Sequence, residues 1–273
     1  MQTHDSGIDP VSAQTPDNSA QQKPGVLQGK VSLSLQTARA QQFVHGRRKT
    51  PDKPAIWGLL TFAEKIKTLW LASSQDDPFA DWWLMKTDEL LKDGKHCIQD
   101  SAKALNELLD TQCVLQVDTA QSVSPLRIAL RFSNPYPFRA AHLLAEYDQL
   151  MCLWMTVQHV GVLVDEVLEE RLRASAKKLR AVYASPQGYQ QLGVSRAMYS
   201  VEKGIADTAR ALMGDVPADI LSEVRTPNLR PKKCSVPKVK AVSPAIPKDD
   251  SPPAVDTQHQ SPAREAGINA TKR

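Results

Sequence analysis

The side chains best suited to chemistry in this sequence are basic, and the densest group of them lies in a loop at residues 45–54. Arg47, Arg48 and Lys49 follow one another there, with Gly and Pro residues nearby that disfavour regular structure. Arginine and lysine neutralise backbone phosphates and so supply the sequence-independent part of nucleic-acid affinity. The loop therefore predicts phosphate contacts, and a solvated connection between two helices is the alternative interpretation.

A second basic feature follows a strand pattern at residues 126–132. Side chains alternate between the two faces of a strand, so Arg127, Ala129 and Arg131 share one face. The other face is apolar and consists of Ile128, Leu130 and Phe132. The pattern predicts a half-buried strand whose outer face is basic.

No grouping of residues in the sequence predicts catalysis. The sequence has neither a glycine-rich phosphate loop after a strand nor a nucleophile elbow around a serine. His96 and Cys97 are adjacent, and His142 and His159 are seventeen residues apart, whereas helical metal ligands are spaced by three or four residues. We therefore expect a protein that is not an enzyme and that binds neither a metal nor a cofactor.

The composition of the chain fits one large or two small domains, with 273 residues of which 41% are hydrophobic. No apolar run approaches the 18 or so residues that a membrane span needs, and the polar N-terminus does not resemble a signal peptide. The four cysteines are scattered without paired spacing, as expected for reduced thiols. We expect a cytoplasmic protein with no membrane partner.

The net charge of +4 is unevenly distributed along the chain. From Arg225 onward there are ten Lys or Arg residues against four Asp or Glu, and eight prolines lie between Pro227 and Pro262. Residues 1–28 are polar and have no periodicity. Both ends predict disordered tails, residues 1–28 and the basic residues 226–273, around a domain at residues 29–225. The basic tail either contacts nucleic acid or only raises solubility.

The domain between the tails is expected to be α+β and mainly helical. A second strand pattern, at residues 30–36, alternates apolar residues with Lys30, Ser32 and Ser34. Residues 113–117 form a possible third strand, as partner of residues 126–132. Helical periodicity predicts helices at residues 37–44, 56–71, 79–110 with a break or bend near Gly94, 138–160, 165–184 and 195–213.

Several stretches of the chain resemble the AcaB-like family of integrating conjugative elements and conjugative plasmids. They are Asp-Asp-Pro-Phe-Ala-Asp-Trp-Trp-Leu at residues 76–84, Phe-Ser-Asn-Pro-Tyr-Pro-Phe at 132–138, Leu-Leu-Ala-Glu-Tyr-Asp-Gln-Leu at 143–150 and Ala-Ser-Pro-Gln-Gly-Tyr at 184–189. Residues 33–47 also match, and the likeness spans about residues 28–228. It implies a bacterial, DNA-binding transcriptional regulator of conjugation or mobile-element genes.

The resemblance further implies a fold related to ribbon-helix-helix proteins, which act as dimers and insert a two-stranded ribbon into the major groove of double-stranded DNA. The base-reading candidates are then the outward residues of the two strand patterns: Arg127, Arg131, Lys30, Ser32 and Ser34. The phosphate candidates are Arg39, Arg47, Arg48 and Lys49. The strands could lie in one sheet, and plain edge strands with polar residues towards water are the alternative. A non-enzymatic scaffold of the conjugation machinery is the alternative function.

Overall fold

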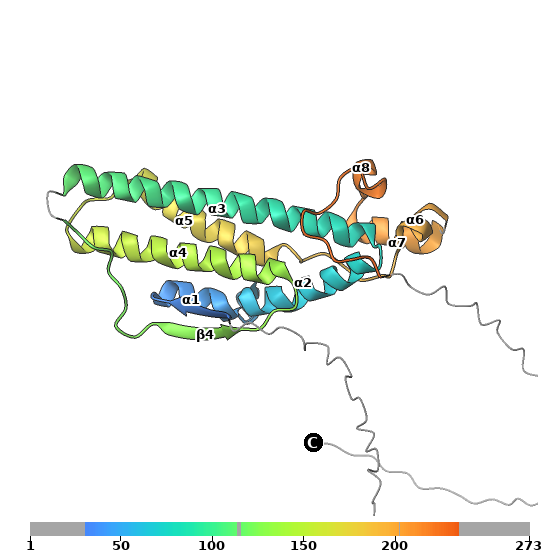
Figure 1. Ribbon diagram of the computed structural model, residues 1–273, viewed down its shortest axis with the longest axis horizontal. Coiled ribbons are helices and arrows are strands. Elements are labelled where there is room, and N and C mark those ends of the chain that lie inside the picture. The colour runs from blue at the N-terminus through green and yellow to red at the C-terminus, as the bar shows by residue number, and fades with distance from the viewer. Residues whose placement is uncertain (1–30, 114–115, 202, 235–273) are drawn as a thin grey trace, which may run out of the picture. The chain divides into compact units, whose positions relative to one another are not determined.

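The computed structural model describes residues 31–113, 116–201 and 203–234 (Figure 1). The predicted N-terminal tail, the strand residue Lys30 and the part of the predicted C-terminal tail from residue 235 onward lie outside the described residues. Residues 226–234, also predicted as tail, are described and contact the helical domain. No helix in the described part of the chain is both long and apolar enough to cross a membrane.

Helices dominate the domain, as the sequence predicts, and the described residues also form two short antiparallel pairs of strands. The helices are α1 Ala38–His45, α2 Leu59–Ser74, α3 Pro78–Gln112, α4 Pro135–His159, α5 Glu166–Ala184, α6 Arg196–Val201, α7 Lys203–Met213 and α8 Ala218–Leu221. The strands are β1 Val31–Leu35, β2 Gly46–Arg47, β3 Ile56–Trp57 and β4 Leu126–Leu130. In Figure 1, α3, α4 and α5 run side by side, and α6, α7 and α8 gather at the end where α3 begins.

Local sequence signals explain where the long helices begin. The carboxylate of Asp77 accepts hydrogen bonds from Phe79 N and Ala80 N, and Pro78 occupies the first turn of α3. Asn134 and Asp165 cap α4 and α5 in the same way. The expected break at Gly94 is wrong: α3 is continuous through this residue, and the glycine lets α3 approach α4 closely. A Cβ atom on Gly94 would lie 3.1 Å from Leu143 Cδ2.

The core fills the space between α2, α3, α4 and α5. Its largest fully buried side chains include Tyr136, Tyr183, Phe62 and Phe79. Phe62 and Tyr183 pack with ring centroids 5.8 Å apart, which joins α2 to α5. The helices therefore share one buried core, and β1 and β4 pack against it.

The strand pairing differs from the sequence-based expectation. Cys113, Gln116 and Val117 are not in a strand, and residues 114–115 lie outside the described residues. β4 pairs instead with β1, antiparallel, with Leu33 opposite Ile128. The hairpin predicted between residues 113–117 and 126–132 is therefore wrong: the partner of β4 is β1, from the start of the domain. Both strands of this β1–β4 ribbon belong to one chain, and a ribbon-helix-helix core stays a prediction.

Candidate nucleic-acid interface

The β1–β4 ribbon has one face in the core and one face in solvent. Leu33, Leu35 and Leu130 are buried and fix the ribbon against the helices. On the other face, Ser32 lies opposite Ala129 and Ser34 lies opposite Arg127, and all four are exposed. The structure thus brings together the outward residues of the two separate strand patterns on one exposed surface.

Arg131 extends the same basic surface. It directly follows β4 and is exposed. Its charge therefore adds to that of Arg127 near the ribbon. The remaining base-reading candidate, Lys30, directly precedes β1 and lies outside the described residues.

One buried carboxylate holds the junction between β1 and α1. Asp148 on α4 accepts hydrogen bonds from Gln36 N at 2.6 Å, from Thr37 N at 2.9 Å and from Thr37 Oγ1 at 2.7 Å. The Thr37 hydroxyl in turn accepts from Ala40 N and so caps α1. A charged acceptor with three donors is a strong anchor, so α4 sets the position at which the ribbon meets α1.

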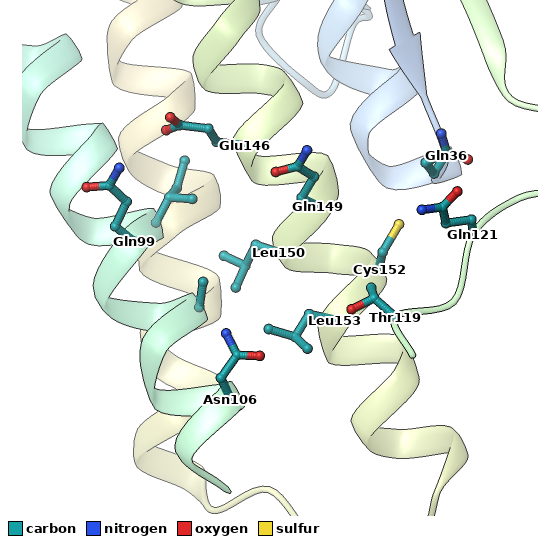
Figure 2. Close-up of a pocket in the computed structure, with 12 residues that line it drawn as sticks. Gln36, Gln99, Asn106, Thr119, Gln121, Glu146, Gln149, Leu150, Cys152 and Leu153 are labelled. Atoms are coloured by element: carbon teal, nitrogen blue, oxygen red, sulfur yellow. The ribbon is translucent and has the colours of Figure 1, made fainter. Parts of the chain in front are cut away.

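The connection before β4 is tied to the same place. The side-chain carbonyl of Gln36 accepts from Ser122 N at 3.0 Å, and the Thr156 hydroxyl accepts from Ala120 N at 2.9 Å. In Figure 2, Gln36 lies beside Gln121 of this connection. Both strands of the ribbon are therefore attached to α4 within a few residues of their ends.

These attachments border a cavity of about 530 Å³ between α3, α4 and the connection that precedes β4 (Figure 2). Its polar lining is mostly carboxamide: Gln36, Gln99, Asn106, Gln121 and Gln149. Glu146 is its one charged side chain, and no lysine or arginine is among the described residues that line it. The cavity is therefore chemically unlike the basic outer face and offers no binding site for phosphate.

The basic loop is a small hairpin rather than an irregular connection. β2 pairs with β3, and Thr50 and Lys53 exchange backbone hydrogen bonds nearer its tip. The Arg47 guanidinium donates to Pro54 O at 3.1 Å. Arg48 and Lys49 are exposed. The hairpin therefore presents three adjacent basic residues, and the side chain of one of them, Arg47, is fixed by a backbone carbonyl of the same hairpin.

Close backbone contact between two glycines makes this hairpin possible. Gly46 has φ of 71°, a left-handed conformation that glycine adopts easily. A Cβ atom on Gly46 would lie 2.6 Å from Gly58 N, and a Cβ atom on Gly58 would lie 2.4 Å from Gly46 N. At the base of the hairpin, between the end of α1 and the start of α2, both positions therefore require glycine.

The last phosphate candidate, Arg39, lies on the exposed side of α1. Its guanidinium carbon is 4.5 Å from the ring centroid of Trp154 on α4, a cation–π contact. The structure therefore places Arg39 beside α4, away from the β2–β3 hairpin at the other end of α1.

The acidic residues Asp77 and Asp81 at the start of α3 are bound by neighbouring side chains. Asp81 is fully buried and pairs with Arg196 at 2.6 Å and Arg230 at 3.2 Å. Burial raises the pKa of Asp77, whose carboxylate accepts a hydrogen bond from the Tyr189 hydroxyl. In the described part of the chain, no three His, Cys, Asp or Glu residues are arranged to hold a metal ion.

Comparison with known proteins adds the family. A family model described as "Transcriptional regulator AcaB" matches residues 23–233. The chain belongs to the AcaB family. A crystal structure of selenomethionine-containing AcaB from uropathogenic E. coli is similar to it, with 13% sequence identity and a TM-score of 0.49, covering 71% of this chain and 95% of that one. No curated protein matches.

AcaB-family membership confirms the resemblance read from the sequence and makes this chain a member of a family of transcriptional regulators. Sequence reasoning missed Asp148, although it quoted the motif that contains it, because an aspartate within a helix has no special signal. Nor did it predict the contact of Arg180 on α5 with the Phe43 ring. The partners of both residues come from segments far away in the sequence.

Proposed function

We propose that this AcaB-family chain regulates transcription by binding double-stranded DNA through the outer face of the β1–β4 ribbon. The observation that carries the proposal is the cross-strand arrangement of Ser32, Ser34 and Arg127 on one exposed face. Arginine donates two parallel hydrogen bonds to guanine, and serine hydrogen-bonds to several bases. Two strands lie about 4.8 Å apart, which suits a major groove about 12 Å wide.

The basic residues around the ribbon would position the protein without reading sequence. Arg39 on α1 and Arg47, Arg48 and Lys49 on the β2–β3 hairpin are the phosphate contacts in this proposal. Conjugation or mobile-element genes are the proposed targets, in the bacterial cytoplasm, as the resemblance implies.

A homodimer is also part of the proposal. A two-stranded ribbon leaves one edge of each strand unpaired, and β1 and β4 pair only with each other in the described part of the chain. Val31 and Leu126, at opposite ends of the two strands, are 44% and 40% exposed. Sedimentation equilibrium of the purified chain would test it, because a monomer at all concentrations would contradict a dimer.

Fluorescence anisotropy tests the DNA-binding proposal directly. Labelled duplexes from the promoters of the element that encodes the protein would be compared with shuffled duplexes at two salt concentrations. We expect tighter binding to one promoter sequence. The measurement is repeated on a chain shortened after Cys234, which removes residues 235–273 and keeps residues 228–234, because the latter contact the helical domain. Selective binding that survives this truncation would place base reading in the folded domain.

Arg127→Ala is the decisive substitution, and Arg171→Ala on α5 is the matched control, an exposed arginine on the side that faces α3. Loss of a bidentate contact to guanine costs about 1–3 kcal/mol of discrimination against the wrong base. We therefore expect Arg127→Ala to lower the preference for promoter over shuffled DNA and Arg171→Ala to keep it. Binding that is unselective and disappears with residues 235–273 would favour the scaffold function instead.

A further inference from the structure

A groove between α1, α4 and α5 has a basic rim and an aromatic floor. Its volume is about 560 Å³. Three arginines and one glutamate line it: Arg39 from α1, and Arg173, Arg180 and Glu169 from α5. The aromatic residues are Phe43, Tyr147 and Trp154. An excess of positive charge over a low-dielectric surface attracts an anion more strongly than the same charges do in water.

Two of the three arginines are held in place while their hydrogen-bond donors stay unused. Arg39 lies over the Trp154 ring at 4.5 Å, and Arg180 lies over the Phe43 ring at 5.4 Å. Such a contact uses the flat face of the guanidinium and leaves its N–H groups, which lie in the plane, available. Among the described residues, neither arginine forms an ion pair or donates a hydrogen bond.

The third arginine, Arg173, already has acidic partners, so Arg39 and Arg180 are the two that remain available to a bound anion. Arg173 pairs with Glu169 at 2.8 Å and with Glu170 at 2.9 Å, so its charge is already balanced. Arg39 and Arg180, by contrast, both act on the Tyr147 phenol between α1 and α5: burial raises the pKa of Tyr147, and the two positive charges oppose that rise. The positive electrostatic potentials of Arg39 and Arg180 therefore overlap at Tyr147.

The groove lies close to the ribbon. Arg39 is four residues after Leu35, the last residue of β1, so their Cα atoms are at most about 14 Å apart. A ribbon in a major groove about 12 Å wide has phosphate backbone on both sides at similar distances. A phosphate next to the ribbon is therefore within reach of the groove.

We propose that this groove binds the DNA backbone beside the ribbon, with Arg39 and Arg180 as its two phosphate ligands. The inference rests on the proposed DNA binding and adds a second contact surface, on α5, to it. Arginine suits this role because its planar donors match phosphate oxygens in pairs. The aromatic floor fixes both guanidinium groups before binding, which lowers the entropy lost on contact.

The salt dependence of DNA affinity tests the groove. The logarithm of affinity falls with the logarithm of salt concentration by about 0.9 per phosphate contact. We expect Arg180→Gln and Arg39→Gln each to reduce this slope by about 0.9 and to weaken promoter and shuffled DNA by the same factor. Thermal unfolding of each variant verifies that the fold is kept.

Arg171→Gln is the matched control on the same helix. It lies nine residues before Arg180, two and a half helical turns, and therefore on the opposite face of α5. We expect an unchanged slope for this variant. If Arg180→Gln and Arg171→Gln had equal slopes, the arginines of the groove would only cover aromatic rings, and the inference would be wrong. If the unaltered chain bound no DNA at any salt, both proposals would fail.

A direct signal from the groove separates backbone phosphate from a free nucleotide. Trp154 lies under Arg39, so the emission of the unaltered chain minus that of Trp154→Phe reports on the groove. We expect duplex DNA to change this difference and ATP at the same salt not to change it. Saturable binding of ATP that Arg180→Gln removes, with an unchanged slope on DNA, would assign the groove to a free nucleotide and overturn the inference.

Discussion

At the scale of single residues, Asp81 is a charged side chain held at the start of α3 by several partners. It is fully buried, and it holds Arg196 and Arg230, whose side chains are only 11% and 19% exposed. The Ser73 hydroxyl donates to the same carboxylate. Without it, Arg196 and Arg230 would keep only the more exposed carboxylates of Asp76 and Glu223 as acidic partners.

We predict that Asp81→Ala lowers the free energy of unfolding by about 1.5–3 kcal/mol, because two arginines and the Ser73 hydroxyl lose a buried charged acceptor. Urea denaturation followed by tryptophan fluorescence would measure it. Asp93→Ala is the control: Asp93 pairs with Lys178 at 3.5 Å in a 59% exposed position, and such pairs contribute about 0–1 kcal/mol. Equal effects of the two substitutions would contradict the importance of burial here.

The glycine contact at the hairpin gives a second prediction at this scale. Gly58→Ala should destabilise the protein by at least about 2 kcal/mol, because the new Cβ atom would lie 2.4 Å from Gly46 N and the backbone must move. Gly204→Ala on α7 has no atom within 4 Å and should stabilise slightly, by about 0.5 kcal/mol or less. Thermal unfolding of both variants checks the opposite signs.

At the scale of elements, the sequence predicts what is locally encoded. The starts of α3 and α5 follow from caps and prolines within a few residues, and both are confirmed. The pairing of β1 with β4 joins segments that are more than ninety residues apart, and the local pattern of residues 113–117 suggested a nearer partner. Such a pairing depends on how α4 positions both strands, which no short window of sequence contains.

The candidate interface was likewise predictable only where its features are encoded locally in the sequence. Alternation correctly indicated the outward sides of β1 and β4, because a half-buried strand shows its polar face in its sequence. It did not indicate that Ser34 and Arg127 are cross-strand neighbours, nor that Arg39 and Arg180 border one groove. Both facts depend on tertiary packing.

Asp148, which anchors the junction between β1 and α1, gives a prediction about the local stability of the ribbon. Asp148→Ala would leave Gln36 N, Thr37 N and the Thr37 hydroxyl without their acceptor. Loss of hydrogen bonds to a buried charged acceptor costs about 1.5–3 kcal/mol, and amide exchange at β1 should accelerate more than at α3. Gln149→Ala, the next residue on α4 and an exposed one, is the control. Equal acceleration in β1 and α3 would mean that Asp148 stabilises the whole fold instead.

At the scale of the whole domain, residues 227–234 pack back against the helices near the start of α3. The Tyr136 hydroxyl donates to Leu229 O, Asn228 donates to Asp88, and Cys234 N donates to Ser74 O. Lys233 pairs with Asp76 and with Glu223. This segment, rich in proline and lysine, has the composition of a disordered tail, yet its polar groups are matched to those of α2, α3 and α4.

Truncation measures what this segment contributes. A chain that ends at Arg225 loses all of these contacts, whereas a chain that ends at Cys234 keeps them. We predict a lower midpoint of thermal unfolding for the chain ending at Arg225, and no comparable loss for the chain ending at Cys234. Equal midpoints would show that residues 226–234 contribute little to stability.

The charges of this segment also predict how stability depends on pH. Hydrogen bonds from Lys233 and Arg230 lower the pKa of Glu223 from 4.5 to about 2. Because the pKa is lower in the folded state than in the unfolded chain, the stabilisation is complete above about pH 4.5 and disappears as the pH falls towards 2. We therefore expect Glu223→Gln to be less stable than the unaltered chain at pH 7 and the two to converge near pH 2. Thermal unfolding across that range measures the difference, and a constant gap between the two proteins would mean that Glu223 contributes through packing rather than through its charge.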